Sequence, residues 1–88
     1  MNSATPQDCD QQAVTLGDIV RVLTLSRDFI ECFPEDEQIL IESMIGKLFK
    51  VIAIDEEGQA CVMREWHDER GQPQTHVIAL DAHEMKKV

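Results

Sequence analysis

Short runs rich in branched apolar residues, several of them alternating with polar residues at the two-residue period of β-strands, recur along this chain. The alternation stops at residues 51–54, where four consecutive side chains are apolar, and this predicts a bulge or sharp bend. We therefore expect five short strands, over residues 19–25, 47–55, 60–66, 75–80 and 85–88.

The segments between the expected strands have the composition of turns. Residues 55–59 read DEEGQ and supply a glycine for a positive φ angle, which predicts a hairpin turn between the second and third strands. Residues 67–74 predict a longer exposed loop, because they contain glycine, proline and several charges. Residues 81–84 predict one turn of 3₁₀ helix before the last strand.

Residues 34–45 have apolar positions at helical spacing. Pro34 suits the first turn of a helix, and the acidic residues after it favour the positive end of the helix dipole. Gly46 predicts that the helix ends in a left-handed conformation. Residues 26–33 are expected to be a connector that makes at most a short helical turn. The expected apolar stripe consists of Leu40, Ile41, Met44 and Ile45.

These elements predict a mainly β fold, a small five-stranded barrel with one short α-helix inserted between strands one and two. Closure into a barrel would protect the strand edges of so small a sheet. Residues 15–88 are expected to form the single domain. Residues 1–14 are polar and lack apolar periodicity, which predicts a disordered N-terminal tail.

Two segments resemble a known group of folds. The sequence GDIVRV at residues 17–22, followed by GKLFKVIAIDEEG at residues 46–58, resembles the opening pattern of KOW-type and related SH3-like domains. The run from Gly17 to Val88 is similar to small bacterial SH3-like proteins of unassigned function. The wider group includes electron-transport accessory chains, such as those of nitrile hydratase and ferredoxin–thioredoxin reductase, whose barrel supports a catalytic partner. The resemblance implies an SH3-like barrel and a scaffold role, and it carries over no catalytic residue.

The net charge argues against several classes of partner. The chain has 17 acidic and 8 basic residues, for a formal charge of −9. Nucleic acids and anionic membranes are disfavoured, because both bind proteins mainly through lysine and arginine. A basic surface of another protein is compatible with this charge.

We expect a cytoplasmic location. The first residues have neither the basic nor the apolar segment of a signal peptide, and no apolar run approaches the roughly 20 residues that span a bilayer. The three cysteines, Cys9, Cys32 and Cys61, are widely spaced, which predicts free thiols and a reducing compartment. Cys32 and Cys61 are expected to be small core residues.

A metal site is one alternative for the histidines. His67 ends the third expected strand and His76 begins the fourth. If the strand register sets them opposite each other, they could bind a metal with Cys61 or Glu65. A shift of one residue would separate them, and they would then be ordinary residues at the ends of strands.

No combination of residues predicts catalysis or a cofactor. His83 with Asp81 or Glu84 could form a carboxylate–imidazole pair, but no nucleophile or glycine-rich loop accompanies it. Such a cluster more often holds a turn together through hydrogen bonds to the backbone. The protein is therefore expected not to be an enzyme.

The expected function is that of a non-catalytic protein-interaction or scaffold module. Trp66, the only tryptophan, is either an interface anchor or a cap on the core. Glu35, Asp36 and Glu37 could face a basic partner, although the helix dipole already accounts for their position. The alternatives are a KOW-like module that binds nucleic acid or the ribosome, and a small metal-binding protein using His67 and His76. The sequence leaves the oligomeric state open.

Overall fold

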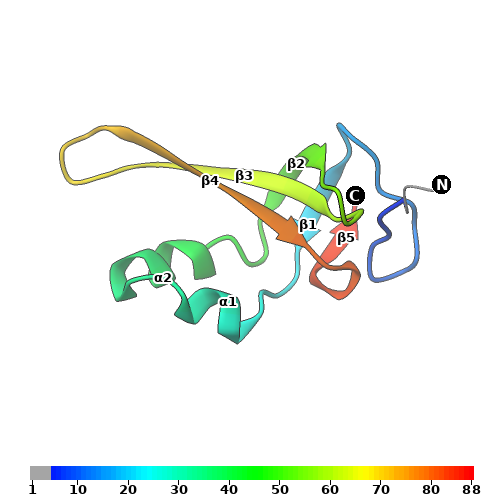
Figure 1. Ribbon diagram of the computed structural model, residues 1–88, viewed down its shortest axis with the longest axis horizontal. Helices are drawn as coiled ribbons and strands as arrows, with labels where there is room; N and C mark the ends of the chain where they lie inside the picture. Colours follow the sequence, from blue (N-terminus) through cyan, green and yellow to red (C-terminus); the bar gives the residue numbers. More distant parts are fainter. Residues whose placement is uncertain (1–4) are drawn as a thin grey trace.

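The computed structural model describes residues 5–88 and has five strands, two short α-helices and one 3₁₀ turn in this range (Figure 1). The elements in chain order are β1 (Ile19–Val22), α1 (Arg27–Glu31), α2 (Glu35–Glu42), β2 (Leu48–Ile54), β3 (Ala60–His67), β4 (Pro73–Leu80), the 3₁₀ turn η1 (Ala82–Glu84) and β5 (Met85–Lys87). The mainly β class and the five predicted strands are confirmed, and β1 ends earlier than predicted.

Two short helices, rather than the single predicted one, lie between β1 and β2. α1 has Asp28 in its first turn and buries Ile30, so the connector is more ordered than predicted. α2 begins after Pro34 and has the three predicted acids in its first turn. Neither α-helix in the described range is long and apolar enough to cross a membrane.

The second helix also ends earlier than predicted, at Glu42. The backbone N–H groups of Met44 and Ile45 bond to carbonyls three residues back, which tightens the chain into turns. Gly46 then takes a φ angle of +88°, the left-handed conformation expected from the sequence.

The strands form one antiparallel sheet in the order β4-β3-β2-β1-β5. β2 joins two parts of this sheet, because its residues 48–50 pair with β1 and its residues 51–54 pair with β3. The register shifts between Val51 and Ala53, which confirms the predicted bulge. Within residues 5–88, β4 and β5 lie at opposite edges and do not pair, so strand pairing does not close the sheet into a barrel.

One face of the sheet forms the core. Val20 and Val22 of β1, Val51 of β2 and Val62 of β3 are fully buried there, and side chains two apart in β1 share this face. Ile30 of α1 and Ile41 of α2 join the same cluster, so the helices cover part of this face. The opposite face of the sheet carries side chains that are more exposed, among them Ile19, Leu48, Ile52 and Val77.

The segment before β1 is packed against the rest of the protein from residue 5 onward, which differs from the predicted tail; residues 1–4 lie outside the described range. Val14 is fully buried, and Asp8 is only 2% exposed. The backbone N–H of Cys9 donates to the carbonyl of Met85 on β5. The polar composition of the segment predicts a tail, but the Asp8 side chain accepts a hydrogen bond from the backbone of Lys87, far along the chain.

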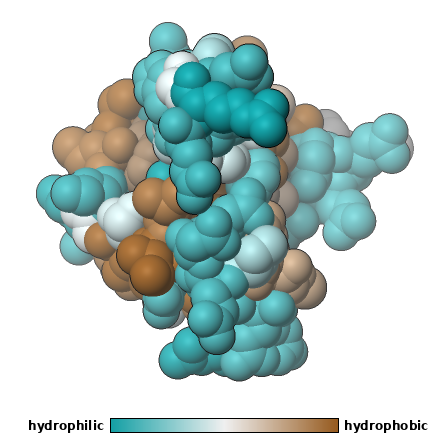
Figure 2. Space-filling model, turned by 90° about the vertical axis from the view of Figure 1, so that its left-hand side faces the viewer, coloured by the Kyte–Doolittle hydropathy of each residue, from teal (hydrophilic) through white to brown (hydrophobic). Residues whose placement is uncertain are grey.

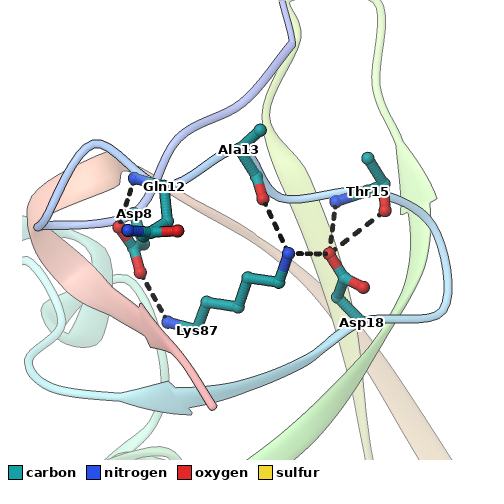
Figure 3. Close-up of polar contacts among 6 residues, drawn as sticks. All are labelled: Asp8, Gln12, Ala13, Thr15, Asp18 and Lys87. Atoms are coloured by element: carbon teal, nitrogen blue, oxygen red, sulfur yellow. Dashed lines mark hydrogen bonds and ion pairs between the residues drawn. The ribbon is translucent and has the colours of Figure 1, made fainter.

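Lys87 of β5 holds this segment at three points (Figure 3). Its backbone N–H donates to the Asp8 carboxylate at 2.7 Å, and its ammonium donates to the carbonyl of Ala13 at 3.2 Å. The same ammonium lies 3.4 Å from the carboxylate of Asp18, which also accepts hydrogen bonds from Thr15. Burial favours the neutral form of Asp8, but the N–H donors of Lys87, Gln12 and Asp10 outweigh it and hold the pKa of Asp8 below its usual value.

One turn geometry occurs three times in the described chain, in segments 8–12, 55–59 and 68–72. In each, an aspartate opens the turn and a glutamine closes it, and their backbones are joined by an N–H to carbonyl bond of 3.0 Å. The aspartate Oδ1 also accepts the N–H groups of the third and fifth residues. The fourth residue has positive φ: +80° at Gly58 and +78° at Gly71, but +65° at a glutamine, Gln11.

The Asp8 carboxylate gives the first prediction. The pKa of Asp8 is lower in the folded than in the unfolded chain. The carboxylate therefore stabilises the fold fully at pH values above its pKa in the unfolded chain, and this stabilisation is lost as the pH falls through its pKa in the folded chain. We expect Asp8→Asn to lower the free energy of unfolding by about 1–2 kcal/mol at pH 7. The difference from the parent chain should shrink below pH 3.8 in urea denaturation. A difference that stays constant between neutral and acid pH would contradict the assignment; Asp10→Asn is the control, because Asp10 is exposed.

Gln11 gives the second prediction. A non-glycine residue in the left-handed region costs about 1–2 kcal/mol, and glycine removes most of that cost. Gln11→Gly should therefore raise the free energy of unfolding by about 1 kcal/mol in thermal or chemical denaturation, after allowing for the entropy of glycine in the unfolded chain. The matched reverse change, Gly71→Gln, should lower it by a similar amount, since no atom lies within 4 Å of the Cβ position there. Loss of stability in Gln11→Gly would show that this turn is held differently from the other two.

Candidate functional site

A groove lies between α2 and the outer end of the β3–β4 hairpin, which extends beyond the body of the sheet (Figure 1). Its volume is about 630 Å³. Viewed from this end, hydrophobic surface is exposed among hydrophilic groups (Figure 2). The groove is lined by Pro34, Asp36, Glu37, Leu40, Trp66, His67, Asp68, Glu69, Arg70, Gln72 and Gln74.

The hairpin register places Trp66 in this groove. Trp66 lies on the same face of β3 as Val62 and Arg64, because side chains two apart in a strand share a face. Val62 is in the core, whereas Trp66 is two pairs from the hairpin turn, where the sheet passes beyond the core. The indole is therefore partly buried, with one side against the protein and one side toward the groove.

Arg64 lies behind Trp66 and fixes its position. The guanidinium carbon is 4.5 Å from the centre of the indole ring, a cation–π contact. Arg64 is only 9% exposed, and within residues 5–88 no carboxylate lies within ion-pair distance of it. Burial lowers the pKa of Arg64, and the charge of Glu37 on α2 acts in the opposite direction. This cation therefore offsets part of the acidic charge beside the groove.

A row of rings connects Trp66 to the helical segment. His76, opposite Arg64 on β4, has its ring centre 4.6 Å from that of Trp66 at an interplanar angle of 69°. Phe33, just before α2, lies 5.1 Å from His76, and Phe29 of α1 lies 5.2 Å from Phe33. The Nδ1 atom of His76 is buried and has no hydrogen-bond partner in the described structure. The row packs the hairpin against the helical segment on the other side of the groove.

Carboxylates stand on both sides of the groove. Asp36 and Glu37 come from α2, and Asp68 and Glu69 come from the hairpin turn. The N–H of Gln72, followed by those of Arg70 and the side chain of Gln74, lowers the pKa of Asp68, so this group is ionised at neutral pH. Arg70 is the one arginine or lysine among the lining residues, against four carboxylates, and the groove is therefore acidic, with Trp66 as its one large aromatic side chain.

The structure brings together three of the four residues proposed from the sequence as a partner site. Trp66, Asp36 and Glu37 line the same groove, whereas Glu35 does not line it. Sequence reasoning missed the contributions of Leu40, Asp68 and Glu69. The DERGQ turn was visible in the sequence, but its position over α2 depends on the hairpin register.

The histidine pair of the alternative metal hypothesis is not formed. His67 pairs with Pro73, and His76 pairs with Arg64, so the two histidines are not opposite each other as the metal hypothesis requires. Within residues 5–88 no group of three or more histidine, cysteine, aspartate or glutamate side chains is arranged to hold a metal ion.

The acidic residues near His83 hold the backbone. Glu84 accepts the backbone N–H of Asp81 at 2.8 Å and that of Ser26 at 3.1 Å, which joins η1 to the start of α1. Glu84 therefore holds the turn together through hydrogen bonds to the backbone, the alternative to catalysis that the sequence analysis gives for this cluster. Cys61 is buried as predicted, but Cys32 is exposed, so its assignment to the core was wrong.

Comparison of the chain with protein-family models, curated proteins and solved structures finds no match.

His76 gives the prediction from this site. Replacing His76 with phenylalanine keeps a ring in the row and removes the buried nitrogen that lacks a partner. We expect His76→Phe to raise the free energy of unfolding at neutral pH by about 1 kcal/mol, measured by chemical denaturation. The control, His67→Phe, changes an exposed residue and should stay within about 0.5 kcal/mol of the parent. A large loss of stability in His76→Phe would mean that the imidazole nitrogen has a partner.

Proposed function

We propose that this protein is a non-catalytic interaction module whose groove between α2 and the β3–β4 hairpin binds an extended basic segment of another protein. The observation that carries the proposal is the position of Trp66 between two acidic walls. Lysine or arginine side chains of the partner pair with Asp36, Glu37, Asp68 or Glu69. An apolar side chain of the partner lies against Trp66 and Leu40.

The charge of the groove supports a protein partner over nucleic acid. Phosphate groups would meet carboxylates on both walls, and the buried Arg64 is stacked on Trp66 rather than presented at the surface. The held position of Trp66 also favours binding, because an anchor that is already ordered loses little entropy when a partner arrives.

We further propose that the fold is an SH3-like barrel of the scaffold type and that the protein acts in the cytoplasm. The division of β2 between two parts of the sheet and the 3₁₀ turn before the last strand support the fold assignment. The free thiols of Cys9, Cys32 and Cys61 support a reducing compartment.

The experiment uses the intrinsic fluorescence of Trp66, the only tryptophan in the chain. Short peptides that alternate lysine with leucine are titrated into the protein, with peptides that alternate glutamate with leucine as the comparison. We expect the lysine peptides to shift the emission and quench it, with an affinity that falls as salt is added. The glutamate peptides should produce no change.

Variants show whether the signal comes from the groove. Asp36→Asn combined with Glu37→Gln should weaken binding of the lysine peptides by about tenfold, because it removes two charges from one wall. The matched control, Glu56→Gln combined with Glu57→Gln, removes two charges from the other hairpin turn and should leave the affinity within about twofold. If both pairs of substitutions weakened peptide binding equally, the binding would come from general charge attraction and not from the groove. The absence of any emission change with the basic peptides would refute the proposal.

A further inference from the structure

The outer edge of β4 is long, regular and free. Its eight residues pair with β3 without a break, from Ala60–Leu80 to His67–Pro73. In the described range no strand lies on its other side. Such an edge offers a row of unpaired backbone groups to another strand.

The hairpin turn determines which groups face outward. The N–H of Asp68 donates to the carbonyl of Gln72, so residues 68 and 72 form a hydrogen-bonded pair. Hydrogen-bonded and non-hydrogen-bonded pairs alternate along an antiparallel ladder. Even-numbered residues of β4 therefore bond to β3, and the N–H and carbonyl groups of Thr75, Val77 and Ala79 point away from the sheet. No backbone partner for these groups is found within residues 5–88.

The side chains of β4 do not protect this edge. Edge strands are usually shielded by charges, bulges or proline. β4 has no aspartate, glutamate, lysine or arginine along its length, in a chain with 17 acidic and 8 basic residues, and the ring of its one histidine, His76, packs against Trp66. Its proline, Pro73, lies at the turn end, and Val77 in the middle of the strand is 60% exposed.

We propose that β4 pairs antiparallel with β4 of a second copy of this chain, about a two-fold axis at Val77. This register sets Val77 opposite Val77 of the second copy, and Thr75 opposite Ala79 at each end. These are the residues whose backbone groups face outward, so every outward N–H between residues 75 and 79 gains a carbonyl. Registers that set odd-numbered residues opposite even-numbered ones would leave these groups unpaired. Among the remaining registers, the one centred on Val77 sets the two exposed Val77 side chains opposite each other.

The charge distribution favours a second copy over a basic strand from another protein. A basic strand would find no carboxylate on β4 to pair with, whereas a copy of β4 meets no aspartate, glutamate, lysine or arginine. The contact is small, below the roughly 1,200 Å² of a standard interface, so the dimer is weak. We expect it to form at concentrations of about 100 µM and above and to dissociate near 1 µM.

The test is amide hydrogen exchange of the full chain at these two concentrations. We expect exchange at Thr75, Val77 and Ala79 to slow at the high concentration by about fivefold, in step with a rise of the sedimentation mass toward that of a dimer. Exchange at residues 76, 78 and 80 should be much less sensitive, because β3 already protects those amides.

Two variants of the edge provide independent checks. Val77→Lys places two positive charges at the axis and should leave a monomer, whereas Ile39→Lys makes the same change on an exposed residue of α2 and should dimerise like the parent. Thr75→Pro removes an outward N–H that β3 does not use and should also give a monomer with an intact sheet by circular dichroism.

A chain that stays monomeric at the high concentration would overturn the proposal. So would a dimer that persists in both edge variants, or exchange at Val77 that slows only when a basic peptide is added. The result is separate from the groove, because Val77→Lys should still bind the lysine peptides and the Asp36, Glu37 double variant should still dimerise.

Discussion

The carboxylate of Asp68 accepts two backbone N–H groups of its own turn, and this interaction sets the register of the β3–β4 hairpin. A shift of one residue would move every side chain of one strand to the other face. In the observed register Arg64 is opposite His76, and Trp66 lies on the same face as the core residue Val62. The same turn occurs at Asp55 and at Asp8, so one turn geometry shapes both hairpins and the segment before β1.

The two surfaces that we assign to binding follow from that register. The inner face of the hairpin, beyond the limit of the core, carries Trp66 over α2, and the acids of the helix dipole and of the turn meet beside it. The outer edge of β4 exposes the backbone N–H and carbonyl groups of its odd-numbered residues. At the other end of the molecule Lys87 holds the N-terminal segment, so that side of the sheet is occupied by the chain itself (Figure 3).

Local pattern predicted the strands and the bulge in β2, because both depend on neighbouring residues and on burial. It did not predict the place of the segment before β1, because Asp8 is bound by the N–H of Lys87, 79 residues away. The separation of His67 from His76 could not be read either, since register depends on turn geometry. The Asp-x-x-x-Gln pattern was visible three times, and its shared geometry could have indicated both the order at Asp8 and the hairpin register. The acids of α2 were predicted for the dipole, but their proximity to Trp66 requires the fold.

The most direct test of this account is the pattern of cross-strand NOEs between α-protons of β3 and β4 in the monomer at low concentration. Facing α-protons are close only in non-hydrogen-bonded pairs, so strong NOEs should join Met63 with Val77 and Glu65 with Thr75. NOEs displaced by one residue, such as Arg64 with Val77, would contradict the register. They would also contradict the position of Trp66 in the groove and the assignment of the backbone groups that β4 exposes at its outer edge.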